Sequence, residues 1–79
     1  MKYLYKLRAG IIHDEDGETF QTYGVDCLSN GMILTSVEDI FLDSQMAETF
    51  VKLCNGINLP PAYLEVIAQK AVEEYHKIT

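Results

Sequence analysis

The chain has 79 residues, 48% of them hydrophobic, and 12 acidic against 6 basic residues give a formal charge of −6. This length holds one domain, residues 1–79, with a thin core that leaves dimerisation open as one way to add stability. An acidic chain binds phosphate poorly, so we expect no nucleic acid as a partner, whereas a basic protein surface would be compatible. No apolar run is long enough to span a membrane, so we expect no membrane partner.

The first residues and the cysteines indicate the compartment. Residues 1–8 alternate charged with apolar side chains and lack the apolar segment of a signal peptide, so we expect a cytoplasmic protein. Cys27 and Cys54 do not form a CxxC pair. We interpret both as reduced, buried thiols that pack as small apolar side chains, with a bridge or a reactive thiol as the alternative.

Alternating residues predict a first strand over about 3–12 with one buried face. One face carries Tyr3, Tyr5, Leu7, Ala9 and Ile11, and the other carries the even-numbered residues from Leu4 to Ile12. The polar segment 13–18 then predicts a hairpin turn, because Gly17 can adopt a positive φ.

A second strand is predicted over about 19–28, with Val25 and Cys27 on one face and Phe20 on the other. Asn30-Gly31 is typical of a two-residue hairpin turn. The third strand, about 32–41, begins with three consecutive apolar residues, which suggests cover on both faces.

Helical spacing begins after Asp43 or Ser44, either of which can cap a helix. The first helix is predicted over about 44–55 and ends at Asn55-Gly56. The second is predicted over about 61–76, with Pro61 at its first position. The apolar stripes are Met46, Phe50, Leu53, Cys54 and Ile57 in the first helix, and Leu64, Ile67, Ala68, Ala71 and Tyr75 in the second.

These elements define an α+β fold of the order β-β-β-α-α. We expect a three-stranded antiparallel β-meander that is packed on one face by a C-terminal helical hairpin.

The acidic turn is the first candidate site, and it is formed by Asp14, Glu15, Asp16 and Glu18. An EF-hand calcium loop does not fit, because that register would place Ile12 first and Tyr23 twelfth, and neither supplies a carboxylate. The turn is interpreted as a solvated hairpin tip, with a weak cation site or a contact loop for a basic partner as the alternatives.

Catalytic chemistry has no clear signature in this sequence. His13 has no convincing nucleophile beside it, and His76 suits a helix C-terminus as a favourable charge. Glu38-Asp39 and Glu73-Glu74 are adjacent carboxylates whose side chains diverge. We therefore expect no enzyme, no catalytic residue, no metal site and no cofactor.

The sheet offers a candidate interaction surface. The five tyrosines suit either core packing or an interface. If the helices cover one sheet face, the other presents Leu4 and Phe20 beside Lys6 and Arg8. Such an apolar remnant is a reason to bind another protein or a second copy.

Two parts of the chain carry a recognisable pattern: residues 22–25 (TYGV), and residues 51–55 (VKLCN) together with 59–67 (LPPAYLEVI). Together they resemble a family of short proteins of Clostridia-like bacteria. The family pattern is roughly TYGI followed by CNxxxLSPxHL. This chain has Ala62-Tyr63 where the family usually has a residue and His. That family has no assigned activity, so the resemblance implies a small bacterial protein and no catalytic residue.

The sequence thus favours a non-enzymatic protein–protein interaction module, with a homodimer as one form. The alternative is a mobile-element-type inhibitor or regulator that presents its acidic surface to a nucleic-acid-binding protein.

Overall fold

The computed structural model describes residues 2–78, and it describes side chains as far as Glu74. Within this part of the chain the elements follow the order β-β-β-α-α, which confirms the predicted α+β fold. The side chains of Tyr75 and His76 lie outside the described residues. The elements are β1 (Leu4–His13), β2 (Thr19–Ser29), β3 (Met32–Phe41), α1 (Ser44–Ile57), the 3₁₀ turn η1 (Pro61–Tyr63) and α2 (Leu64–Ile78).

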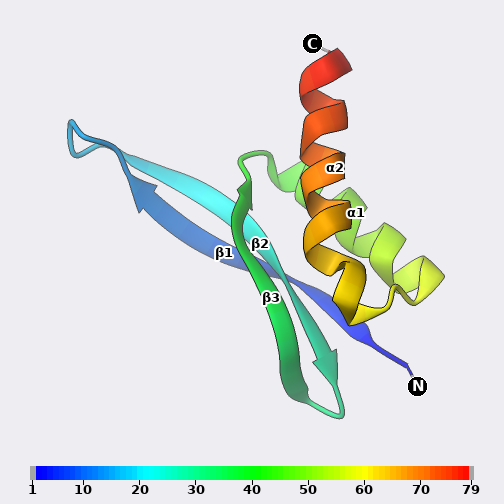
Figure 1. Ribbon diagram of the computed structural model, residues 1–79. Coiled ribbons are helices and arrows are strands. Elements are labelled where there is room, and N and C mark those ends of the chain that lie inside the picture. Colours follow the sequence, from blue (N-terminus) through cyan, green and yellow to red (C-terminus); the bar gives the residue numbers. More distant parts are fainter. Residues whose placement is uncertain (1, 79) are drawn as a thin grey trace.

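The three strands form one antiparallel sheet in the order β1-β2-β3. Both helices lie on the same side of this sheet (Figure 1). Helix α1 packs mainly on β1 and β2, whereas α2 packs on β3. One sheet face is therefore covered and the other is open, as the sequence predicted.

Helix α1 begins where it was predicted to begin, but it ends later. Asp43 is the N-cap, and its Oδ1 accepts a hydrogen bond of 2.9 Å from the backbone N–H of Gln45. At the other end the helix passes through Gly56 and stops at Asn58, which has a left-handed φ of 50°. Asparagine tolerates this conformation better than most residues, so the helix ends at Ile57, two residues later than predicted.

The core lies between the covered sheet face and the helices. The rings of Phe41 and Phe50 pack with their centroids 5.3 Å apart. In α1 the predicted stripe is partly wrong, because Leu53 and Ile57 are more than half exposed while Ala47 is buried. The buried residues are Tyr5, Val25, Cys27, Phe41, Ala47, Phe50, Cys54, Leu59, Leu64 and Ala68.

A large bulge bends β3 beside Gly24. Val25 pairs with Val37 and Tyr23 pairs with Phe41, so three residues of β3 lie opposite the single residue Gly24. The bulge includes Asp39, whose φ is 52°. A Cβ on residue 24 would lie 2.1 Å from the carbonyl oxygen of Val37. Glycine is therefore required where the two strands approach each other.

The outer part of β1 and β2 extends beyond the rest of the molecule (Figure 1). No β3 residue pairs with β2 before Tyr23, so residues 10–22 form a two-stranded hairpin that we call the projecting ribbon. Every residue from 11 to 21 is exposed. The radius of gyration is 13.1 Å, against about 11.6 Å for a compact domain of this length.

Candidate interaction surface

The four residues predicted as an interaction surface lie on the open sheet face. Leu4, Lys6 and Arg8 alternate with the buried Tyr5, and Phe20 pairs with Ile12 on the same face. Leu4 and Phe20 are 49% and 44% exposed. Leu4 lies eight residues along β1 from the partner of Phe20, a separation of about 26 Å. The structure therefore places the two apolar residues at opposite ends of the face.

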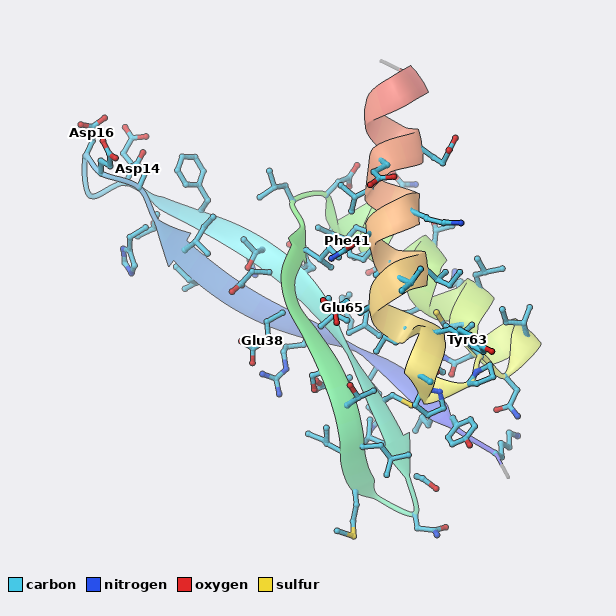
Figure 2. The ribbon with its side chains drawn as sticks, in the orientation of Figure 1. Asp14, Asp16, Glu38, Phe41, Tyr63 and Glu65 are labelled. Carbon is cyan, nitrogen blue, oxygen red and sulfur yellow. The ribbon has the colours of Figure 1, made fainter. Side chains whose placement is uncertain are left out.

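A polar cluster separates these two ends. Arg8 donates from Nε to Asp26 and from Nη1 to Glu38, both at 2.8 Å. Ser36 also donates to Asp26, at 2.6 Å. Glu38 points away from the helices (Figure 2). The guanidinium of Arg8 thus holds β1, β2 and the bulged part of β3 together and is already engaged by two carboxylates.

A second polar contact lies beside this cluster. The hydroxyl of Thr22, which is fully buried, donates a hydrogen bond to Asp39. A Cβ on Gly10 would lie 2.6 Å from Oδ1 of the same Asp39. The two side chains therefore meet beside Gly10 of β1, where a larger residue would not fit. The shallow pocket of about 170 Å³ beside it includes Glu38 and Asp39 in its wall, and both carboxylates already accept a hydrogen bond.

The predicted acidic loop forms the tip of the projecting ribbon, where Asp14 and Asp16 are found in Figure 2. Oδ1 of Asp14 accepts hydrogen bonds from the backbone N–H groups of Asp16 and Glu18, at 2.9 and 2.8 Å. Gly17 has the expected positive φ, 83°. Asp14 thus stabilises its own turn, while Glu15, Asp16 and Glu18 present exposed carboxylates.

Two asparagines bind the outer edge of β1. The side chain of Asn55 accepts from the Tyr5 N–H at 2.8 Å and donates to the Tyr5 carbonyl at 3.0 Å. Asn58 accepts from the N–H of Tyr3 at 2.9 Å. Sequence reasoning missed this role and assigned Asn55 to a helix stop. Two asparagines three residues apart before a Pro-Pro link are the only signal, and many loops share it.

The buried titratable groups lie beneath the same end of β1. The hydroxyl of Tyr5 donates to the carbonyl of Leu59, and burial raises the pKa of this phenol well above its usual value. Cys27 and Cys54 are free thiols and fully buried. Burial, with a contribution from Cys27, raises the pKa of the Cys54 thiol to about 11. A thiol with a raised pKa is a poor nucleophile, which matches the structural role predicted for it.

An open groove of about 460 Å³ runs along α1. Its wall is mostly apolar and includes Met46, Phe50 and Leu53 of α1 and Ala71 of α2. Among the described residues, no three His, Cys, Asp or Glu side chains are grouped so that they could hold a metal ion. Over the same residues, no helix combines the length and the apolar character that crossing a membrane requires.

The fold and this surface define the chain as a small α+β domain with an uncovered two-stranded ribbon. The outer edge of β1 is covered by Asn55 and Asn58 at its start. No family model, no curated protein and no solved structure matches it.

Proposed function

We propose that this chain is a non-enzymatic protein–protein interaction module that binds through its projecting ribbon, residues 10–22. The observation that carries the proposal is the uniform exposure of residues 11–21, although they form regular strands. The ribbon carries Ile11 on one face, 66% exposed, and Ile12 and Phe20 on the other, 39% and 44% exposed. Because a two-stranded hairpin alone is marginally stable in water, a partner would supply the missing cover.

The molecular surface supports the same proposal. The accessible surface is 5620 Å², whereas a compact monomer of 8.9 kDa exposes about 4800 Å². The excess of about 800 Å² is close to the area that one partner contributes to an interface of ordinary size. The excess accessible surface of the chain is therefore about as large as the area that one interface of ordinary size would bury on it.

The test compares two pairs of exposed apolar side chains. The double variant Ile12→Thr/Phe20→Thr removes the apolar contacts of the ribbon and keeps residues that suit strands. The control, Leu53→Gln/Val66→Gln, removes two helix side chains that are 53% and 54% exposed. Each tagged variant is co-expressed with an untagged copy of the chain and used for affinity capture from the native lysate. Quantitative mass spectrometry then measures the amount of each bound protein.

We expect the ribbon variant to lose at least tenfold of the bound protein and the helix variant to retain it. The bound protein is either another chain or the untagged copy. Equal capture by the two variants would contradict the role of the ribbon, and recovery of the bait alone by the wild type would contradict an interaction module.

A further inference from the structure

The backbone of β1 divides into a protected half and a free half. Even-numbered residues direct their N–H and C=O groups at β2, as the Asp14 N–H does to the carbonyl of Glu18 at 2.9 Å. Odd-numbered residues direct theirs outward, as the contacts of Tyr5 with Asn55 show. Sheet geometry requires this alternation. Since Asn58 binds Tyr3, the first two outward positions of the strand edge are occupied.

The outward groups from Leu7 to His13 have no such cover. β1 is an edge strand, and no other described strand lies beside it. The helices do not reach this part, since Leu7 is 37% and Ile11 66% exposed and Ala9 is exposed as well. We call the outward N–H and C=O groups of residues 7, 9, 11 and 13 the free edge. Such an edge pairs readily with another strand.

We propose that two copies of this chain pair their free edges antiparallel about a two-fold axis at Gly10, which extends the sheet from three strands to six. This inference rests on the proposed function and names a second copy as the partner. The two ends of the free edge set the register. Asn55 occupies the position beside Tyr5, and the turn begins at Asp14, so the free segment is centred on Gly10.

In this register Leu7 exchanges backbone hydrogen bonds with His13 of the second copy, and Ala9 does so with Ile11 of the second copy. The two-fold axis repeats both pairs, which gives about eight new hydrogen bonds. The odd-numbered side chains then form an apolar strip on the helix side of the enlarged sheet. The exposed Leu7 and Ile11 become cross-strand neighbours of residues from the second copy.

Charge favours a second copy in the same register. Lys6 lies opposite Asp14 of the second copy, on the open face of the sheet, and the two-fold axis repeats this contact. Each basic part of β1 thus meets the acidic tip of the other copy. Each chain carries a net charge of −6, so this local attraction opposes the overall repulsion between two like-charged chains.

The first test removes one hydrogen-bond donor from the free edge. The N–H of Ala9 points outward, so Ala9→Pro spares the ladder with β2. The matched control is Gln21→Pro, because the N–H of Gln21 points outward from the opposite edge of the β1–β2 hairpin, where β3 does not reach. Sedimentation velocity over a concentration series should show a wild-type dimer, a Kd at least tenfold higher for Ala9→Pro, and an unchanged Kd for Gln21→Pro.

The second test needs no variant at the edge. Amide hydrogen exchange of the wild type should show protection of the odd-numbered residues from Leu7 to His13 that grows with protein concentration. The amides of Thr19 and Gln21 should not respond. This pattern distinguishes edge pairing from contact through either sheet face, and it holds even if a proline variant folds poorly.

The third test addresses charge. Lys6→Glu should raise the Kd several-fold at low salt, whereas Lys70→Glu, an equal charge change on the exposed face of α2, should leave it nearly unchanged. Wild-type chain that stays monomeric at concentrations on the order of a millimolar, or Ala9→Pro that dimerises like the wild type, would overturn the edge pairing. Ribbon-dependent capture of a different protein would then still support the proposed function.

Discussion

Gly24 is the residue at which β2 and β3 come closest. The nearest backbone atom, the carbonyl oxygen of Val37, leaves no space for a Cβ. The backbone of β3 cannot move away easily, because Phe41 is fixed in the core just beyond the bulge.

We predict that Gly24→Ala lowers the free energy of unfolding by about 1–3 kcal/mol, the usual cost of forcing extra atoms into a packed site. The control is Gly56→Ala in α1, where a Cβ meets nothing within 4 Å. That change should raise stability by about 0.5–1 kcal/mol, because alanine favours the helix. Urea denaturation measures both, and a neutral Gly24→Ala would contradict the close approach of β2 and β3.

A second single residue, Cys54, makes the free energy of unfolding depend on pH. Its pKa rises from 9.0 to about 11 on folding, so the unfolded chain loses the thiol proton first as the pH rises. The contribution of the thiol is complete below pH 9 and is lost as the pH rises through about 11.

We predict that the urea midpoint falls between about pH 9 and pH 11, and that Cys54→Ala reduces this slope while lowering stability at neutral pH through the cavity it leaves. Tyr5, whose pKa is also raised, adds to the loss at high pH in both proteins. An identical slope in the variant would show that Cys54 does not carry the effect.

At the scale of elements, the contact between α1 and β1 depends on one amide side chain. Asn55 satisfies both outward backbone groups of Tyr5, so it occupies the place of a neighbouring strand over one residue. Arg8 has a comparable role on the open face, but its side chain is 36% exposed and its ion pairs are correspondingly weaker.

We predict that Asn55→Ala lowers the free energy of unfolding by about 1–3 kcal/mol, because two partly buried backbone groups lose their partner. Glu48→Ala, an exposed position on the same helix, should change stability by less than about 0.5 kcal/mol. The difference between the two variants, measured by thermal unfolding, isolates the contact with Tyr5. Equal stability of the two would contradict it.

At the scale of the whole molecule, the order of the elements and the approximate bounds of the strands could be predicted because each strand has a strong local pattern. Alternation over residues 3–12 and the Asn30-Gly31 turn are signals within a few residues, whereas Pro61 begins the 3₁₀ turn that precedes α2. What could not be predicted depends on how far one element covers another. The alternation implied a buried face along all of β1, but the helices cover only its first half, so Ile11 is exposed.

The candidate surface was predictable only in part for the same reason. Sequence parity placed Leu4, Lys6, Arg8 and Phe20 on one face, and they do share it. It gave no information on distance along that face or on the ion pairs of Arg8. The free edge was also invisible in the sequence, because its limit at Tyr5 is set by Asn55, 50 residues later in the chain.

This separation in sequence matters while the chain is being made. Tyr5 is synthesised before the groups that bind it, because Asn55 and Leu59 follow it by 50 and 54 residues. Until Asn55 and Leu59 have been synthesised, all three strands of the β-meander are present but the outer edge of β1 is uncovered along its whole length. Asn55 follows the end of β3 at Phe41 by 14 residues, so at typical rates of synthesis this interval lasts roughly one to three seconds. A chain truncated before Asn55 would keep that edge open permanently and would be the form most prone to aggregate.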